Sequence, residues 1–220
     1  MPSPVHDPIL VLATVAYIAL LLLVLRGLAR PLQLTPFAVR KSVHVGIGVG
    51  TLVTTALYDH LGWALVPPAA FVLLNASGVP RRIVPSITRD GRDPALWVFP
   101  LAVLAIYLLF WERAGRAPVF AGLAALGFAD PAAAVIGSRF GERRFAGWGH
   151  GRSVEGSLAY LAVSGAAAAA IAIAVPGGGH AVRLAVGCGV AGAFVEAISP
   201  AGIDNLTAPL AVAAAFRALA

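Results

Sequence analysis

Long apolar runs without charged residues alternate with short polar segments along this chain. Four of them, 8–25, 61–80, 94–111 and 157–179, reach the length of about 18 residues that an uncharged helix needs to cross a bilayer. With the shorter apolar runs added, about eight transmembrane helices are predicted, with seven as the alternative. The predicted helices cover residues 8–25, 42–58, 61–77, 95–111, 117–138, 155–175, 182–198 and 204–219. The pattern therefore predicts an all-α fold, a polytopic integral membrane helix bundle.

The few charged residues support this topology. Only 12% of the 220 residues are charged and 59% are apolar, which is too few charges for the polar shell of a soluble helical protein. With the N-terminus outside and the chain alternating, twelve of the 16 Lys and Arg residues fall in inner loops, as the positive-inside rule requires. They are Arg26, Arg30, Arg40, Lys41, Arg81, Arg82, Arg89, Arg92, Arg139, Arg143, Arg144 and Arg152. Both termini are therefore predicted to be extracytoplasmic, and the net charge of +6 reflects orientation in the membrane rather than nucleic-acid binding.

Acidic residues in the predicted helices mark the candidate chemistry, because a carboxylate in a membrane is costly and usually functional. Asp130 interrupts the fifth helix and precedes Pro131, which is expected to bend or break that helix and free backbone groups. Glu196 lies near the inner end of the seventh helix, and Asp204 opens the eighth. Simpler explanations stay open for each: an ion pair for Asp130, an interfacial charge for Glu196 and a helix N-cap for Asp204.

Basic residues gather at the same predicted membrane face. Arg40, Lys41 and His44 are neighbours on the second helix at its inner start, and Glu155 lies at the inner start of the sixth. Interfacial anchoring and helix capping would also explain these residues. The topology rests on Lys and Arg counts alone, yet it places these residues and the three acids at one face. Carboxylates beside cations are what a magnesium–polyphosphate site requires.

Three segments together resemble the CTP-dependent polyprenol kinase family, which includes phytol kinases, dolichol kinases and CTP-dependent diacylglycerol kinases. The first is RKSVHVGIG at 40–48. The second is GFADPAAAVIGSRFGERRF at 127–145, followed by GRSVEGSLA at 151–159, and the third is EAISPAGIDNLTAPL at 196–210. The short chain looks most like the phytol kinase branch. It departs from the family pattern at Arg152, where Lys is usual, and at Asn75, near which an acid is common.

The resemblance implies a lipid kinase that transfers the terminal phosphate of CTP to an isoprenoid alcohol such as phytol, geranylgeraniol or a related polyprenol, with Mg²⁺ as cofactor. It implies one transmembrane catalytic domain over 1–220, with a peripheral first helix at 8–25 and a family-like core from about 36 to 220. The protein would be multi-pass in a bacterial plasma membrane, and its active site would face the cytosol. The implied catalytic residues are Arg40, Lys41, His44, Asp130, Glu196 and Asp204, of which Asp130, Glu196 and Asp204 would bind the metal. The implied nucleotide-binding residues are Gly137, Arg139, Gly141, Arg152, Ser153, Glu155, Gly156, Ser157 and Asn205.

Other functions stay open at this stage. A diacylglycerol kinase would use the same machinery on another lipid alcohol. A phosphatidate cytidylyltransferase would share the CTP donor but release pyrophosphate, and the chain lacks a Gly-His-Gly-Gly segment of the kind such enzymes carry. A lipid transporter would need acids spread through the membrane depth, whereas the acids here are predicted at one face. The residues do not distinguish CTP from ATP, and they leave the oligomeric state open.

Overall fold

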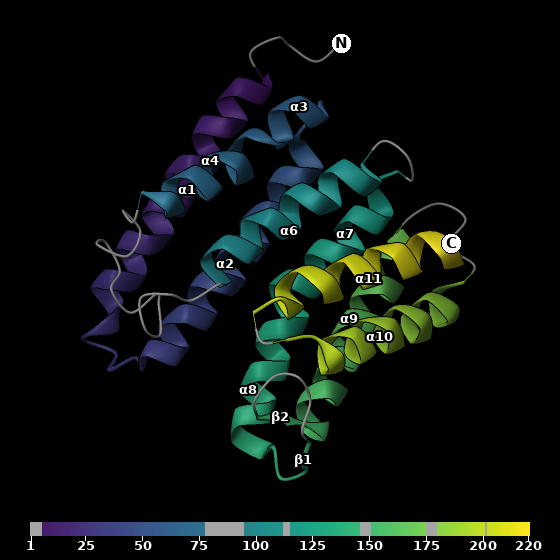
Figure 1. The fold of residues 1–220 in the computed structure, drawn as a ribbon. Coiled ribbons are helices and arrows are strands. Elements are labelled where there is room, and N and C mark those ends of the chain that lie inside the picture. The colour runs from purple at the N-terminus through teal and green to yellow at the C-terminus, as the bar shows by residue number, and fades with distance from the viewer. Residues whose placement is uncertain (1–5, 78–94, 112–114, 146–150, 175–179, 201) are drawn as a thin grey trace.

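The computed structural model describes residues 6–77, 95–111, 115–145, 151–174, 180–200 and 202–220 (Figure 1). These residues form an all-α bundle with one small hairpin, which confirms the predicted all-α fold. The elements are α1 (His6–Ala29), α2 (Pro36–Leu57), α3 (Leu61–Ala64), α4 (Val66–Ala76), α6 (Ala95–Phe110), α7 (Arg116–Ala124), η2 (Ala125–Ala129), α8 (Asp130–Phe140), β1 (Arg144–Phe145), β2 (Arg152–Ser153), α9 (Val154–Ala174), α10 (Ala181–Ile198) and α11 (Asp204–Leu219). Each of the eight predicted segments coincides with one of these helices or with consecutive ones.

Four of the described helical stretches are long and apolar enough to cross a membrane. They are His6–Ala29, Arg116–Phe140, Val154–Ala174 and Ala181–Ile198. Leu61–Asn75 and Trp97–Phe110 are apolar but shorter. The structure therefore bears out a chain with several membrane-length helices, while the count of eight spans and the placement of the termini stay predictions. The predicted inner-loop residues Arg81, Arg82, Arg89 and Arg92 lie outside the described residues.

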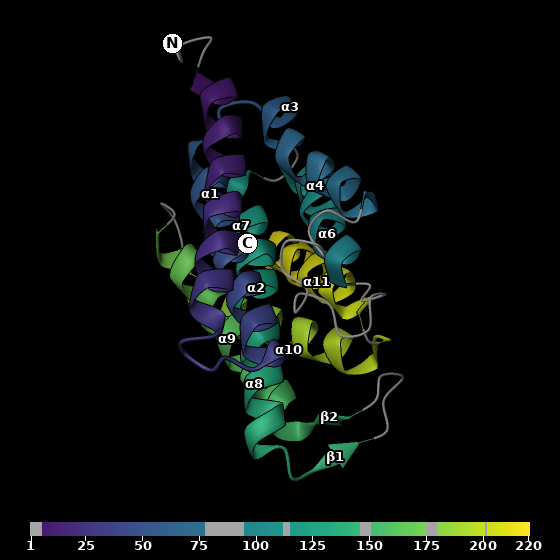
Figure 2. The same ribbon diagram turned by 90° about the vertical axis from the view of Figure 1, so that its left-hand side faces the viewer.

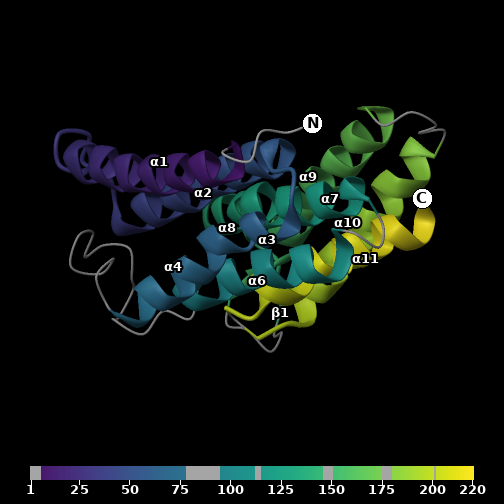
Figure 3. The same ribbon diagram turned by 90° about the horizontal axis from the view of Figure 1, so that it is seen from above.

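The helices surround the short π-helix η2. Residues of η2 are almost entirely buried, and the segment contacts α2, α7, α8, α9 and α11. On one side α1 packs against α2 and α4 packs against α6, and on the other α9, α10 and α11 form a tightly packed group (Figure 3). Figure 2 shows the β1–β2 hairpin projecting beyond the lower end of α8. The segment that carries Asp130 thus lies at the centre of the bundle.

The two ends of the bundle are distinct. At the start of α1, the Asp7 carboxylate accepts hydrogen bonds from the backbone N–H groups of Asp59 (3.0 Å) and His60 (3.1 Å), so α1 is tied to the turn between α2 and α3. The start of α2, with Lys41 and His44, lies at the opposite end. Helix α11 begins at Asp204, near the start of α2, and runs towards the end of the bundle at which α1 starts. The start of α1 and the end of α11 therefore lie on the same side of the bundle.

Two glycines bring α2 and η2 into backbone contact. A Cβ atom on Gly48 would lie 2.6 Å from the Cα atom of Gly127, and a Cβ atom on Gly127 would lie 3.0 Å from the Cα atom of Gly48. Small residues of this kind allow helices in lipid to approach closely. The contact holds His44, one turn before Gly48, against the segment that carries Asp130.

Replacing Gly48 by Ala should therefore destabilise the protein, because the new methyl group has backbone rather than a movable side chain in its way. We expect a loss of about 1–3 kcal/mol in the free energy of unfolding, the usual cost of overpacking, measured by denaturant titration in detergent micelles. Gly27 of α1 is the matched control, since no atom lies within 4 Å of a Cβ built there. Gly27→Ala should be neutral or slightly stabilising. Equal stability of the two variants would contradict the role of the Gly48–Gly127 contact.

Candidate functional site

The π-helix before Asp130 follows from Pro131, which has no N–H to donate. The Asp130 N–H bonds to the carbonyl five residues earlier, on Ala125, which is the π-helical pattern. The next carbonyl, on Leu126, would need the N–H of residue 131 and cannot have it. The expectation that Pro131 frees a backbone group is confirmed for the Leu126 carbonyl. The helix does not break there but widens into a π-helix.

His44 meets the carbonyl that Pro131 leaves free. Its Nε2 atom lies 2.7 Å from the Leu126 oxygen. Because a carbonyl can only accept, Nε2 carries a proton and donates it to the Leu126 oxygen. The ring also packs edge-on against Phe99, with centroids 4.8 Å apart, so its orientation is held from two sides.

Removing this donor should cost stability without unfolding the chain. We expect His44→Phe to destabilise the protein by about 1–3 kcal/mol, since the buried Leu126 carbonyl then has no partner. His44→Gln keeps an N–H donor of similar reach and should lose less. Denaturant titration of both variants in detergent measures the difference. If Phe and Gln were equally stable at position 44, the hydrogen bond would contribute nothing.

Lys41 and Asp130 form the first ion pair of the site. The Lys41 Nζ atom donates to the Asp130 Oδ2 atom at 2.8 Å, and His44 Nε2 lies 3.7 Å from the same oxygen. Their side chains are 22% and 16% exposed, so the pair sits partly out of water, where charges interact more strongly than on the surface. It joins the start of α2 to the start of α8, two segments that are far apart in the sequence.

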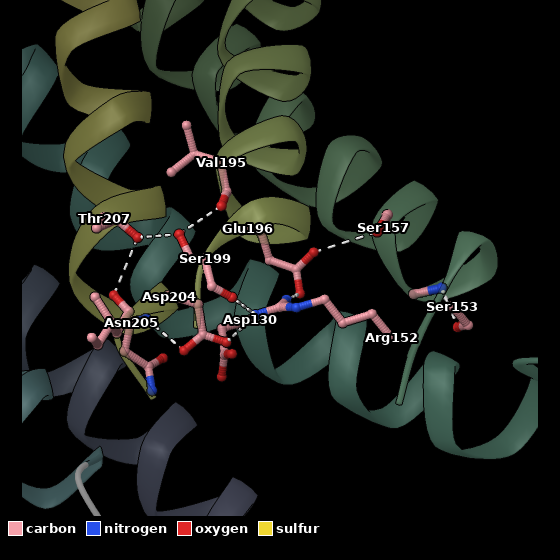
Figure 4. Close-up of polar contacts among 12 residues, drawn as sticks. Asp130, Arg152, Ser153, Ser157, Val195, Glu196, Ser199, Asp204, Asn205 and Thr207 are labelled. Atoms are coloured by element: carbon pink, nitrogen blue, oxygen red, sulfur yellow. Dashed lines mark hydrogen bonds and ion pairs between the residues drawn. The ribbon is translucent and has the colours of Figure 1, made fainter. Parts of the chain in front are cut away.

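Arg152 is the centre of a second group of charges. Its guanidinium contacts the carboxylate of Glu196, donates to Asp204 Oδ2 at 2.9 Å and donates to the Ser199 carbonyl at 3.1 Å. Figure 4 shows the carboxylates of Asp130, Glu196 and Asp204 gathered around this side chain. All three partners of Arg152 come from the end of α10 and the start of α11, so one guanidinium ties β2 to both helices.

Local hydrogen bonds fix the residues that present these charges. In the β1–β2 hairpin, Arg144 pairs with Ser153 and Phe145 pairs with Arg152, which places Arg152 immediately before α9. In the turn between α10 and α11, Asp204 Oδ1 accepts from the backbone N–H groups of Gly202 (2.9 Å) and Asn205 (3.0 Å). Gly202 has φ +90°, a conformation that favours glycine. The N-cap explanation for Asp204 is wrong, since Ile203 is the N-cap of α11 and the Asp204 carboxylate binds the preceding turn and Arg152 instead.

Several buried polar atoms of the site have no hydrogen-bond partner among the described residues. They are Arg152 Nε, Asn205 Oδ1 and the hydroxyl of Tyr160. Buried polar groups are normally satisfied, because an unpaired one loses its bonds to water without return. The Arg152 Nε donor and the Asn205 Oδ1 acceptor are thus unpaired beside a cluster of charged side chains. Such an arrangement is typical of a site that binds a charged ligand.

The acids of the site suit a magnesium ion that arrives with phosphate. Mg²⁺ usually keeps several waters and takes one or two carboxylates plus phosphate oxygens rather than a complete protein cage. Asp130, Glu196 and Asp204 do not bring three ligand atoms within 4.8 Å of one another, and each is paired with Lys41 or Arg152, so their binding of Mg²⁺ stays a prediction. Within the described part of the chain, the group of three possible ligands whose atoms lie within 4.8 Å of one another is His6, Asp7 and Asp59, at the other end of the bundle.

The structure brings together most of the residues predicted for the site. Lys41, His44, Asp130, Arg152, Glu196, Asp204 and Asn205 lie in one region, and Ser157 donates to Glu196 at 3.4 Å. Arg40 lines a cavity next to Lys41. Arg139 is exposed on the last turn of α8, and Glu155 accepts from the Arg143 N–H at 3.4 Å, so these two lie with the hairpin instead.

The glycines predicted to bind nucleotide pack α8 against β2 and α9. A Cβ atom on Gly137 would lie 3.1 Å from the Ser153 Oγ atom, and one on Gly156 would lie 3.0 Å from the Ala133 carbonyl. One on Gly141 would overlap the Gly137 carbonyl. Ser153 itself accepts from the Gly156 N–H at 3.1 Å and so caps α9. Close packing thus accounts for these residues, and their contact with a nucleotide stays a prediction.

Some residues of the site were not predicted. The Ser199 carbonyl binds Arg152, and the Ser199 hydroxyl lies 2.6 Å from that of Thr207. Tyr160 is 1% exposed, and Phe99 contacts His44. Ser199 could have been predicted from its position between Glu196 and Asp204, in the segment that resembles the family motif. Tyr160 could have been predicted because it follows Ser157 by one helical turn. Phe99 carries no signal that distinguishes it from the other apolar residues of its helix.

An apolar cavity of about 180 Å³ opens beside this charged cluster. It lies between α1, α2, α4 and α6, and its polar wall includes Arg40, Lys41, His44 and Asn205. The remaining lining is mostly aliphatic and aromatic. A hydrocarbon in this cavity would therefore end next to the Lys41–Asp130 ion pair.

Comparison with known proteins finds a relative of known activity. The chain is 30% identical over 186 residues to the phytol kinase of Synechocystis sp., an alignment that covers 81% of this chain and 78% of that protein. No family model matches the chain, and no solved structure matches it.

Proposed function

Because the chain belongs to the polyprenol kinase family that includes the phytol kinases, we propose that it transfers the terminal phosphate of CTP to the hydroxyl of an isoprenoid alcohol dissolved in the membrane. The observation that carries this proposal is the position of a charged cluster at the mouth of an apolar cavity. A lipid alcohol has one polar group on a hydrocarbon chain, and this arrangement offers a place for each part.

The cations of the cluster would hold the phosphates. Lys41 and Arg40 reach the cavity wall, and Arg152 keeps a buried, unpartnered Nε donor beside its two carboxylate partners. Phosphoryl transfer depends on positioning and on neutralising charge more than on covalent help from the protein. A cluster of preorganised cations provides both without moving during the reaction.

Asp130 would receive the proton of the alcohol, since its carboxylate is bonded to Lys41, which lines the cavity. The alcohol oxygen would form a bond to the terminal phosphorus, the bond from that phosphorus to the bridging oxygen would break, and CDP would leave. The hydroxyl at the cavity mouth lies next to Lys41 and His44, and Asp130 is bonded to the first and 3.7 Å from the second. The Nε2 N–H of His44 already donates to the Leu126 carbonyl. In this proposal His44 therefore holds the site in position and does not act as a general acid in the reaction.

Mg²⁺ belongs to the proposal through the carboxylates. Asp130, Glu196 and Asp204 would hold it together with the phosphates, and the ion would supply neutralisation of the charge that builds on the transferred group. Asp204 also holds the turn that presents Asn205, whose unpartnered Oδ1 atom adds one more oxygen.

The predicted orientation places this cluster at the cytosolic face of a bacterial plasma membrane, where a nucleotide is available. In support, α2, α9 and α11 each begin near the cluster, while Asp130 lies within the continuous helical stretch Arg116–Phe140. Asp130, Glu196 and Asp204 gather around one cation, Arg152, and such a single cluster favours an enzyme over a transporter, whose polar residues would follow a path through the membrane.

One assay tests the proposal. Purified protein is incubated in detergent with Mg²⁺ and each of the four nucleoside triphosphates, together with prenols, diacylglycerol or phosphatidate. We expect a prenyl monophosphate and CDP with CTP, and no product when EDTA removes the metal. Phosphorylated diacylglycerol would change the substrate, release of pyrophosphate would indicate a cytidylyltransferase, and absence of any phosphorylated lipid would reject a kinase.

A further inference from the structure

A second group of titratable side chains lies at the end of the bundle opposite to the charged cluster. His6 and Asp7 open α1, and Asp59 and His60 form the turn between α2 and α3. Within the described part of the chain, His6, Asp7 and Asp59 each offer a ligand atom within 4.8 Å of the other two. The proposed reaction uses none of these residues, so their arrangement has to be explained separately.

The Asp7 carboxylate is held in place by the turn that it faces. Its side chain is 4% exposed, and its Oδ1 and Oδ2 atoms accept from the backbone N–H groups of Asp59 (3.0 Å) and His60 (3.1 Å). The His60 Nδ1 atom also lies 2.7 Å from Oδ2. Hydrogen bonds of this kind orient a carboxylate that binds a metal and increase its affinity for the ion. The Asp7 side chain is thus fixed before any ion arrives.

The Nδ1 atom of His6 lies near two carboxylates without a hydrogen bond to either. It is 3.4 Å from Asp7 Oδ1 and 3.1 Å from Asp59 Oδ2. The atom is buried, yet it has no hydrogen-bond partner among the described residues. Buried ring nitrogens are normally bonded, and the nitrogen of a neutral imidazole is the commonest metal ligand in proteins. His6 therefore offers an unused ligand atom beside two charged oxygens.

The spacing of these atoms fits a tetrahedral zinc ion. Zinc binds imidazole nitrogen and carboxylate oxygen at about 2.0–2.1 Å, and two such bonds at the tetrahedral angle place their ligand atoms about 3.3 Å apart. The distances of 3.1 and 3.4 Å from His6 Nδ1 lie on either side of this value. Mg²⁺ and Ca²⁺ take oxygen ligands, so the nitrogen in this set favours zinc. The side chains of His6 and Asp59 are 42% and 39% exposed, so an ion can enter from water and keep one water as a ligand.

We propose that His6, Asp7 and Asp59 bind a zinc ion, with water as the fourth ligand. His60 then holds the Asp7 carboxylate in position. The ion joins the start of α1 to the turn after α2, two segments that are 52 positions apart. A metal that closes so long a loop stabilises the fold, because it removes freedom from the unfolded chain. Only four of the 24 residues of α1 are buried, so this helix gains most from the additional attachment.

The test measures zinc binding by the whole protein. Tag-free protein in detergent is stripped with EDTA, dialysed and titrated with Zn²⁺ by calorimetry, with an excess of Mg²⁺ that competes for sites made of oxygen ligands alone. We expect one zinc ion per chain, bound with micromolar or tighter affinity. His6→Ala should bind at least about tenfold more weakly. His180→Ala is the matched control, since it removes an exposed histidine at the start of α10, and it should bind as the wild type does.

Thermal unfolding provides a second measurement. An ion that binds only the folded chain raises the temperature of unfolding, so zinc should stabilise the wild type and His180→Ala but not His6→Ala. Failure of the wild type to bind zinc would overturn the inference. Equal zinc affinity in the wild type and His6→Ala would overturn it as well, and the group would then be an ion pair between a protonated His6 and two carboxylates.

Discussion

Replacing Asp130 by Asn should abolish phosphoryl transfer while leaving the protein folded. Asn has the shape of Asp but no charge, so it cannot accept the alcohol proton, attract Mg²⁺ or balance Lys41, whose Nζ atom lies 2.8 Å from the carboxylate. Loss of a single preorganised electrostatic group commonly costs about 10²–10³-fold in kcat. Asp130 combines three such roles, so we expect a fall of at least about a hundredfold, measured as prenyl phosphate formed per enzyme at saturating CTP.

Asp59 provides the control for this substitution. It lies at the opposite end of the bundle and is 39% exposed on its side chain, beside His6. Asp59→Asn removes one negative charge from the same protein and should leave turnover within twofold of the wild type. Both variants should elute as the wild type does in size-exclusion chromatography in detergent. Full turnover by Asp130→Asn would remove Asp130 from the reaction and leave its ion pair with Lys41 as a structural contact.

Replacing Arg152 by Gln should cost both stability and activity. The side chains of Arg152, Glu196 and Asp204 are 10%, 11% and 16% exposed, so two carboxylates would be left nearly buried without their cation. Breaking a buried ion pair by removing one partner typically costs about 3–5 kcal/mol, because the remaining charge has lost both water and partner. Denaturant titration in detergent measures this loss, and the turnover assay should show little remaining activity.

Two further variants separate charge from packing. Arg217 is exposed on α11, so Arg217→Gln should leave stability within about 0.5 kcal/mol of the wild type, as surface changes usually do. Arg152→Lys keeps the positive charge but replaces the planar guanidinium by a single ammonium group. This group cannot bind both carboxylates and the Ser199 carbonyl at once. It should fall between wild type and Arg152→Gln in stability and retain measurable turnover, in keeping with the Lys of the family motif. If Arg152→Gln were as stable as Arg217→Gln, the cluster would not depend on this cation.

Prediction from sequence succeeded where the physical cause is local. Hydropathy over about 20 residues reports whether a segment can lie in lipid, and each predicted segment became a helix. The acids and cations were predicted to meet because charges avoid the bilayer and gather at its faces. Lys41, Asp130, Arg152 and Asp204 do meet in the structure. The effect of Pro131 on its own helix was also accessible, since it depends only on a missing N–H.

The partners within the site depended on packing between distant segments. Lys41 and Asp130 are 89 positions apart, and no periodicity in the chain indicates that Lys41 takes Asp130 while Arg152 takes Glu196 and Asp204. The glycines around Ser153 illustrate the same limit. The family resemblance implies that they bind nucleotide, which stays a prediction, and only the positions of α8 and α9 showed that they also pack these helices together.

Composition and pattern alone determined an all-α chain with several membrane-length helices, because burial in lipid and the avoidance of charge act on each segment separately. The three-dimensional arrangement decided which carboxylate each cation holds, that His44 binds the Leu126 carbonyl, and that Lys41 and Tyr107 line one apolar cavity beside the cluster. These features depend on helix directions and close contacts, which many residues set jointly. No single segment of the sequence contains them.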